Sequence, residues 1–229
     1  MMTHEIVDHT AQVLDLFGAA WILYLLMFMS VFLVAIAVER LLFLRRNRVP
    51  VEKLQQPLLK AMDEGREAVE KLLAPYSGMA AQVALAGVAE LHRGSASVEE
   101  VMGAREAAES KRYDQRLGWL GTIGSNAPFV GLLGTVIGIM GAFADLKLAT
   151  GAAAATANQA IMSSISEALV ATAIGLFVAI PAVVAFNYLR TRVKEAQADT
   201  RVLAGIVLAW TKQEAPRGDA GSPSFRRVA

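Results

Sequence analysis

Long uncharged apolar runs alternate along the chain with charged, amphipathic stretches. Three of the apolar runs are long enough for a helix to cross about 30 Å of hydrocarbon, which takes roughly 20 residues. They predict transmembrane helices at residues 16–38, 118–144 and 161–189, the last with a continuous apolar run from Ala168 onward. Apolar residues make up 55% of the 229-residue chain, more than soluble domains usually hold, and this supports a membrane protein.

Basic residues gather at one end of every apolar run. Lys and Arg beside a membrane span are retained on the cytoplasmic side. We therefore expect an outer N-terminal segment at residues 1–15, a cytoplasmic domain at 39–117, an outer loop at 145–160 and a cytoplasmic C-terminus. The basic residues that decide this orientation are Arg40, Arg45, Arg46, Arg48, Lys111, Arg112, Arg116, Arg190, Arg192 and Lys194, against Lys147 alone in the outer segments.

The sequence of the cytoplasmic stretch predicts helices. Ser97 to Glu100 has the Ser-x-x-Glu form of a capping box, and no proline follows until Pro128, so one helix is expected to run from the cytosol into the second span. The predicted fold is thus an all-α membrane protein with three transmembrane helices, the second and third extended into a cytoplasmic helical domain.

The third helix is expected to continue as a cytoplasmic helix over residues 190–213. Its apolar positions recur at spacings of three and four, which fits either a coiled-coil-like seam or an ordinary amphipathic surface helix. Residues 214–229 are polar and rich in Gly and Pro, and they are expected to be a disordered tail. The seam positions are Phe186, Leu189, Val193, Ala196, Thr200, Leu203, Val207 and Trp210.

The second span carries glycines on one helix face. Such a strip lets another backbone approach closely, so this span is expected to pack against a helix. Pro128 removes a helical hydrogen bond, and Ser125 and Asn126 offer polar atoms that could satisfy the freed carbonyl. Thr135 beside the strip either bonds its own helix or has a functional role. The strip consists of Gly131, Gly134, Gly138 and Gly141.

Glu167 allows two interpretations. With Ser164 three residues before it, Glu167 could close a capping box at the start of the third helix, in contact with water. Alternatively the helix begins earlier and Glu167 lies within the span, where a carboxylate costs a few kcal/mol and faces a polar cavity or a bundle interior. Thr172 lies five residues on, about 140° around the helix, so the two groups flank a surface. The sequence alone leaves both interpretations open.

The residue inventory argues against an enzyme. The chain holds no cysteine, its three histidines lie outside the apolar runs, and it contains no Gly-x4-Gly-Lys-Ser/Thr nucleotide motif. An intramembrane protease would need a nucleophile with a base or a pair of membrane aspartates, whereas Asp145 lies only at the edge of a span. No metal or cofactor is expected. A net charge of +1 gives no basic field for nucleic acid.

Two motifs carry a family resemblance. The segments LGTIGSNAPFVGLLGTVIGIMGAF and ISEALVATAIGLFVAIPAVVAFNYL, within residues 120–189, resemble the paired signature of the MotA/TolQ/ExbB proton-channel family. The three spans, the outer N-terminus and the large first cytoplasmic loop fit its three-span ExbB/TolQ branch. Flagellar-type MotA proteins normally have four spans and match less well.

The resemblance implies a homo-oligomeric ring, a pentamer in the family, in the bacterial inner membrane with a periplasmic N-terminus. It implies that the second and third helices enclose single-span helices of an ExbD/TolR-like partner, and that Thr135, Glu167 and Thr172 line this lumen. It also implies that an aspartate of the partner handles the proton, so this chain alone would be an incomplete proton-driven motor. A TonB/TolA-like or gliding-machinery protein is a further implied partner.

The alternative is a passive membrane scaffold or assembly protein without ion conduction. Such a protein would tolerate loss of Glu167 and Thr172. The sequence does not separate outer-membrane transport, envelope maintenance and gliding as the process served.

Overall fold

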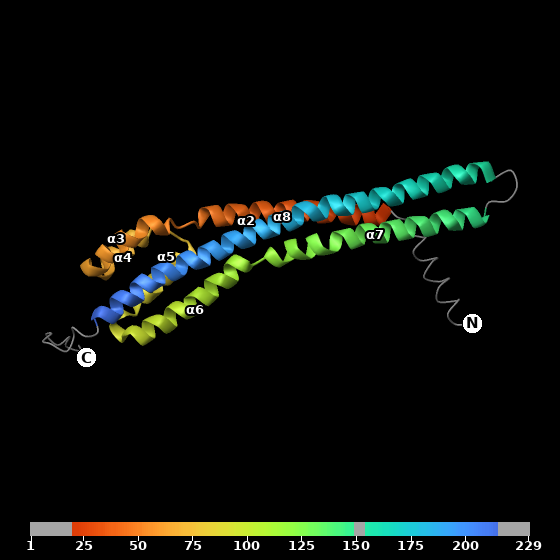
Figure 1. Cartoon of the computed structure of the whole chain (residues 1–229). Helices are drawn as coiled ribbons and strands as arrows, with labels where there is room; N and C mark the ends of the chain where they lie inside the picture. The colour runs from red at the N-terminus through yellow and green to blue at the C-terminus, as the bar shows by residue number, and fades with distance from the viewer. Residues whose placement is uncertain (1–19, 149–153, 215–229) are drawn as a thin grey trace, which may run out of the picture. The chain divides into compact units, whose positions relative to one another are not determined.

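A computed structural model describes residues 20–148 and 154–214, and within them every regular element is a helix (Figure 1). The all-α prediction is confirmed. The elements are α2 (Ala20–Arg46), α3 (Val51–Glu64), α4 (Arg66–Leu73), α5 (Met79–Ala89), the 3-10 turn η1 (Leu91–Arg93), α6 (Ser95–Asp114), α7 (Leu117–Leu148) and α8 (Ala154–Glu214).

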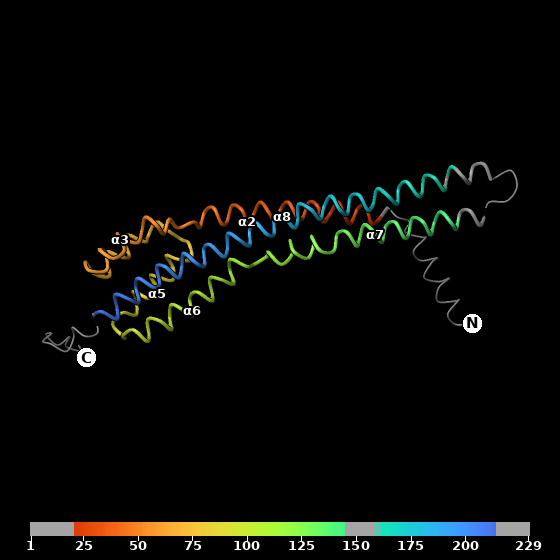
Figure 2. Tube along the Cα trace, viewed as in Figure 1, coloured from red at the N-terminus to blue at the C-terminus, as the bar shows by residue number. Residues whose placement is uncertain are grey.

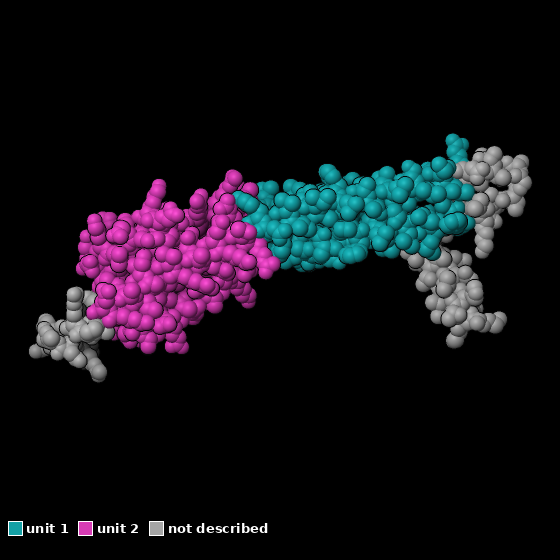
Figure 3. All heavy atoms as spheres, in the orientation of Figure 1, with its two compact units in different colours: residues 1–39, 116–188 teal, residues 40–115, 189–229 magenta. Residues whose placement is uncertain are grey.

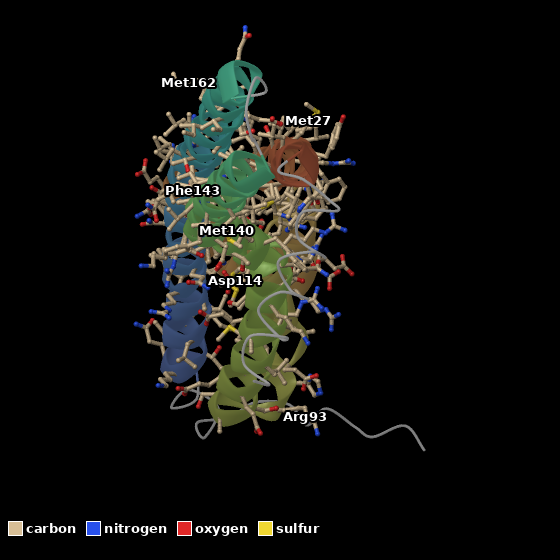
Figure 4. The ribbon with its side chains drawn as sticks, turned by 90° about the vertical axis from the view of Figure 1, so that its right-hand side faces the viewer. Met27, Arg93, Asp114, Met140, Phe143 and Met162 are labelled. Carbon is tan, nitrogen blue, oxygen red and sulfur yellow. The ribbon has the colours of Figure 1, made fainter. Side chains whose placement is uncertain are left out.

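Three helical stretches of the described chain are long and apolar enough to cross a membrane, as predicted. They lie within Trp21–Glu64, Leu117–Ala144 and Ile161–Gln213. Large apolar side chains on these helices point outward, among them Met27 of α2, Phe143 of α7 and Met162 of α8, each more than 60% exposed (Figure 4). Contact of such side chains with acyl chains is favourable, whereas their exposure to water is unfavourable. The chain is a membrane protein.

The chain divides into two compact units (Figure 3). Unit 1 contains α2 up to Glu39, α7, and α8 up to Tyr188. Unit 2 contains α3 to α6, the last turns of α2, and α8 from Leu189 onward. The predicted outer segment 1–15, the first four residues of the predicted first span and the predicted tail from residue 215 lie outside the described residues.

The prediction of one helix running from the cytoplasmic stretch into the second span is wrong. The helix stops at Asp114, Gln115 is extended with ψ 135°, and α7 starts at Leu117. Arg116 has a φ of +67°, a left-handed conformation that a non-glycine residue adopts rarely. An ion pair from Arg116 to Glu39, at 3.1 Å, accompanies this break. The third helix does continue without interruption, through Tyr188 to Glu214.

The predicted capping box at Ser97 is also wrong. Helix α6 begins at Ser95, after Gly94 with a φ of +92°, and no side chain caps it. Gly94 turns the chain without the steric cost that a Cβ would add, so the helix can start two residues before the Ser-x-x-Glu sequence. Ser97 therefore lies inside the first turn.

The described residues of the predicted outer loop, 145–148 and 154–160, are helical. Helix α7 extends to Leu148 and α8 begins at Ala154, and residues 149–153 lie outside the described residues. Alanine has the highest helix propensity of all residues, and the Ala-rich start of α8 follows this preference. Hydropathy and charge, from which the bounds of the outer segment were predicted, do not report this propensity.

The apolar positions of α8 that belong to unit 2 pack against the chain's own helices. This packing favours the interpretation of α8 as an amphipathic surface helix. Thr200, Leu203 and Val207 are fully buried. A Cβ built on Gly87 of α5 would lie 2.6 Å from Met102 Sδ of α6 and 3.3 Å from Val207 Cγ1, so α5, α6 and α8 meet at Gly87. Figure 2 shows the traces of these three helices. The neighbour of this part of α8 is the chain's own helical domain.

Polar contacts fix this packing at its edges. The Trp210 indole donates to Asp63 Oδ1 of α3 at 2.9 Å, and Gln197 donates to Ser110 Oγ of α6 at 3.4 Å. Near the end of α6, the Tyr113 hydroxyl accepts from the Met79 amide at 3.1 Å, and burial raises the pKa of Tyr113. Unit 2 is thus a helical domain with a conventional buried core.

Replacing Asp199 by Asn should stabilise unit 2. Burial, followed by the carboxylates of Glu195 and Glu52, raises the pKa of Asp199, whereas Arg48 acts in the opposite direction. A raised pKa in the folded state means that the ionised form destabilises the fold; this penalty is present above the folded pKa and is lost below the unfolded one. Asp199→Asn should therefore raise the melting temperature in detergent at pH 7, with a smaller gain near about pH 4. The exposed Asp114→Asn is the control, and equal melting temperatures for the two variants would contradict this account.

Candidate functional site

Helices α7 and α8 approach each other closely through the predicted glycine strip. A Cβ on Gly131 would lie 2.8 Å from the Ala171 carbonyl oxygen, one on Gly134 would lie 2.7 Å from Ala171 Cβ, and one on Gly138 would lie 2.7 Å from Ala168 Cβ. Contacts this short leave no room for a side chain. As the α7 residue number rises the α8 partner number falls, so the helices are antiparallel.

The close contact extends beyond the predicted strip. Gly175 of α8 is as tightly placed as the α7 glycines, since its Cβ would lie 2.7 Å from the Ala127 carbonyl oxygen. Gly124 meets Val183 in the same way, at 2.7 Å. The α8 side of this contact was not predicted from the sequence, although Ala168, Ala171 and Gly175 recur at helical spacing. Gly141 is half-buried.

Pro128 lies inside α7, which continues through it. Ser125 and Asn126 were expected to offer hydrogen bonds to the carbonyl that Pro128 frees, but the structure shows them bonded to other carbonyls. Ser125 Oγ donates to the Gly121 carbonyl at 3.0 Å, and Asn126 Nδ2 donates to the Thr122 carbonyl at 2.8 Å. Both acceptors precede the Gly124 carbonyl that Pro128 leaves without its helical donor. Both side chains bond a carbonyl one turn earlier in α7, a pattern that short polar side chains commonly form inside helices.

Thr172 connects the two helices. Its hydroxyl donates to the Gly131 carbonyl oxygen at 3.0 Å, across 41 positions of sequence. A carbonyl of a transmembrane helix is accessible to a neighbouring side chain only where the backbone carries no bulk, which is the situation at Gly131. The glycine strip and Thr172 therefore form one structural feature.

Thr135 bonds within its own helix. Its hydroxyl donates to the Leu132 carbonyl at 2.7 Å, three residues earlier. This matches the simpler of the two interpretations left open by the sequence, with the acceptor at position i−3 rather than i−4. The hydroxyl oxygen keeps its acceptor capacity in this arrangement.

Glu167 lies well inside a helix. Helix α8 begins at Ala154, more than three turns earlier, so the interpretation of Ser164 and Glu167 as a capping box is wrong. The side chain of Glu167 is exposed on the protomer, as are Ser163 and Ser166 beside it. A carboxylate is thus presented on the outer surface of a helix that is apolar enough to cross a membrane.

The three polar residues lie on two edges of the α7–α8 contact. Around α8, Ala171 and Ala168 follow Glu167 by about 40° and 100° and Thr172 follows it by about 140°, so Glu167 and Thr172 flank the residues that meet α7. Around α7, Thr135 lies about 40° beyond Gly131, the residue that Thr172 bonds. Thr135 and Thr172 therefore share one edge, and Glu167 lies on the other.

The remaining chemistry of the described residues is sparse. Among residues 20–148 and 154–214, no three His, Cys, Asp or Glu side chains are grouped so that they could hold a metal ion. What the arrangement offers is one carboxylate and two hydroxyls along an antiparallel helix pair, with Glu167 and Thr172 about 7.5 Å apart along α8. These groups can accept, donate and orient hydrogen bonds.

Comparison with known proteins identifies a family and individual relatives that match part of the chain. The family model described as the MotA/TolQ/ExbB proton channel family matches residues 58–201, which include α7 and most of α8. This match covers more than half of the chain.

Curated relatives agree with the family match. The chain is 34% identical over 178 residues to the biopolymer transport protein ExbB of Salmonella typhimurium, covering 72% of this chain and 69% of that protein. It is 36% identical over 140 residues to ExbB of Xanthomonas campestris pv. campestris, covering 58% of this chain but only about half, 54%, of that relative. It is 44% identical over 95 residues to the Tol-Pal system protein TolQ of Pseudomonas aeruginosa, covering 42% and 39%.

The variant Gly131→Ala should destabilise the α7–α8 pair. The added methyl group would meet the backbone of Ala171 and Thr172, which cannot move aside as a flexible side chain could. The expected loss is about 1–3 kcal/mol, the usual range for overpacking. Thermal unfolding of the purified protein in detergent measures it.

Gly118→Ala is the matched control, because a Cβ on Gly118 meets no atom within 4 Å. Its melting temperature should equal or exceed that of the parent chain, since Ala favours a helix over Gly by about 1 kcal/mol. If the two variants unfolded at the same temperature, the close contact would not contribute as argued.

Proposed function

Because the chain belongs to the MotA/TolQ/ExbB proton channel family, we propose that it is the ring-forming subunit of a proton-driven motor in the bacterial inner membrane. The motor converts proton motive force into mechanical work for outer-membrane transport, envelope maintenance or gliding. The N-terminus is periplasmic and the C-terminus cytoplasmic. The chain has no enzymatic role in this proposal.

The observation that carries the proposal is the position of Glu167. It is exposed on the protomer, several turns inside α8, and close in sequence to the apolar residues Leu169 and Val170, which are themselves exposed. Leaving a carboxylate in acyl chains costs at least a few kcal/mol, so it calls for a protein or water neighbour. If that neighbour is protein, it has to come from another chain, because Glu167 is exposed on the single protomer.

The two-edge arrangement favours a cyclic assembly. In a ring, each interface joins one edge of a subunit to a different edge of the next. Glu167 on one edge of the α7–α8 pair and the threonines on the other would then meet between successive protomers. We propose that each polar site contains Glu167 of one protomer with Thr135 and Thr172 of its neighbour, in a pentamer as in the family.

The enclosed lumen would hold single-span helices of an ExbD/TolR-like partner, which supplies the acid that carries the proton. A proton crossing the membrane releases about 2.3 kcal/mol per 100 mV. The groups of this chain would stabilise and orient that acid in its two protonation states. The chain is similar to both biopolymer transport and Tol-Pal proteins, so the proposal leaves the process open between them.

The variant Glu167→Gln should strongly reduce proton-dependent work while leaving the assembly intact. It keeps the size and much of the hydrogen bonding of the side chain but removes its charge. We expect proton flux into proteoliposomes that hold the chain and its partner to fall by about tenfold or more, equivalent to 1.4 kcal/mol or more at the site. Ser163→Ala, on the same exposed surface, is the control and should retain full flux.

Thr172→Val tests the hydroxyl without changing the volume of the side chain. It should reduce flux and also lower the melting temperature, because the variant loses the bond to the Gly131 carbonyl. Normal flux in both Glu167→Gln and Thr172→Val, at normal expression, would favour a passive scaffold instead.

Disulfide cross-linking tests the arrangement between protomers. The chain contains no cysteine, so introduced cysteines are the only thiols. Glu167→Cys and Thr135→Cys chains of different length, produced together and oxidised, should form a mixed dimer. Glu167→Cys paired with Phe177→Cys is the control, because Phe177 is 75% exposed on another face of α8. Equal mixed-dimer yields for the two pairs would refute the shared site.

A further inference from the structure

A groove in unit 1 lies between α2 and α7, away from the glycine strip. It has a volume of about 340 Å³, comparable with small-molecule sites, and its lining combines apolar residues with a single pair of opposite charges. The lining residues are Phe32, Ala35, Ile36, Glu39, Arg116 and Trp119.

The charged pair lies at one end of the groove. Arg116 Nη1 and Glu39 Oε1 are 3.1 Å apart, and both side chains are about half exposed. A guanidinium has five donors and a carboxylate about four acceptor positions, so each of the two groups can bond several partners at the same time. The pair presents a positive and a negative group side by side with no net charge.

The rest of the groove is apolar and partly open. Phe32 and Trp119 meet edge to face with ring centroids 6.1 Å apart, and the Trp119 side chain is 58% exposed. Phe32 precedes Glu39 by seven residues of continuous helix, about 10 Å along α2. The groove therefore passes from an apolar wall to a polar end over the length of a headgroup and the first part of an acyl chain.

Its position matches a membrane boundary. Glu39 is the first charged residue after the apolar run of α2, and Arg116 is the last before that of α7. An exposed Trp at this level is typical of membrane–water interfaces. The polar end thus faces the headgroup layer and the apolar wall faces hydrocarbon.

We propose that this groove binds one phospholipid with a zwitterionic, primary-amine headgroup, of the phosphatidylethanolamine type. Its phosphate pairs with Arg116, its ammonium donates to Glu39, and the first part of an acyl chain lies on Phe32 and Trp119. A purely anionic headgroup would place a second negative charge beside Glu39. A choline headgroup has no N–H donor for the carboxylate. The site lies on surfaces that the proposed ion pathway does not use.

Native mass spectrometry of the chain in detergent tests the proposal with phosphatidylethanolamine, phosphatidylcholine and phosphatidylglycerol of identical acyl chains. The ethanolamine lipid should be retained most strongly. Arg116→Gln and Glu39→Gln should each weaken its binding by about tenfold, the loss expected for one charge-assisted hydrogen bond. Trp119→Leu should weaken the binding of all three lipids to the same extent, since it removes apolar surface only.

Arg66→Gln is the control variant, because Arg66 forms an equally exposed pair with Glu70 at 2.6 Å in unit 2. It should bind the ethanolamine lipid like the parent chain. The comparison of the three lipids on the parent chain depends on no variant, so misfolding of a variant cannot hide a failure. Equal retention of the three lipids, or a preference for phosphatidylglycerol, overturns the proposal. Cross-linking of Trp119→Cys into dimers with no lipid retained also overturns it, because the groove would then be an interface between copies.

Discussion

The structure of unit 1 depends on the close backbone contact between α7 and α8. Gly131, Gly134, Gly138 and Gly175 let the helices approach until a Cβ at any of them would meet the other helix within 3 Å. In a membrane, helices gain little from burying apolar surface, so van der Waals contact and interhelical hydrogen bonds carry their association. Thr172, bonded to the Gly131 carbonyl, supplies one such bond and fixes the register of the pair.

That register decides where the polar groups lie. With the small residues of α8 turned toward α7, Glu167 is left on one edge of the pair and Thr172 on the other, next to the edge that carries Thr135. No single protomer brings the carboxylate and both hydroxyls together. A repeated head-to-tail interface would do so once per subunit, and it would also remove Glu167 from lipid. The helix packing leaves the Glu167 carboxylate on one edge of the pair, and a ring would remove this charge from lipid. The packing therefore favours the proposed ring.

The three apolar helices and the packing face of α7 could be predicted from the sequence. Hydropathy identifies the spans, and the spacing of Gly131, Gly134 and Gly138 places these glycines on one helix face. The break at Arg116 could not be predicted, since a left-handed arginine has no sequence signature and neither proline nor glycine marks it. The early start of α6 and the helical ends of the outer segment reflect Gly94 and alanine propensity, which hydropathy ignores. The position of Glu167 inside α8 follows from the helix start at Ala154, which hydropathy does not mark.

A nitroxide label at position 167 tests the central claim that this carboxylate faces an enclosed, lipid-free space. The label is attached through Glu167→Cys in the otherwise cysteine-free chain, which is placed in a bilayer together with the proposed single-span partner. Molecular oxygen concentrates among acyl chains, so its collision rate with the label reports contact with lipid. We predict a low rate at position 167 and a high rate for a label at Phe177, which is exposed on another face of α8. An equally high rate at both positions would place Glu167 in lipid and contradict the account.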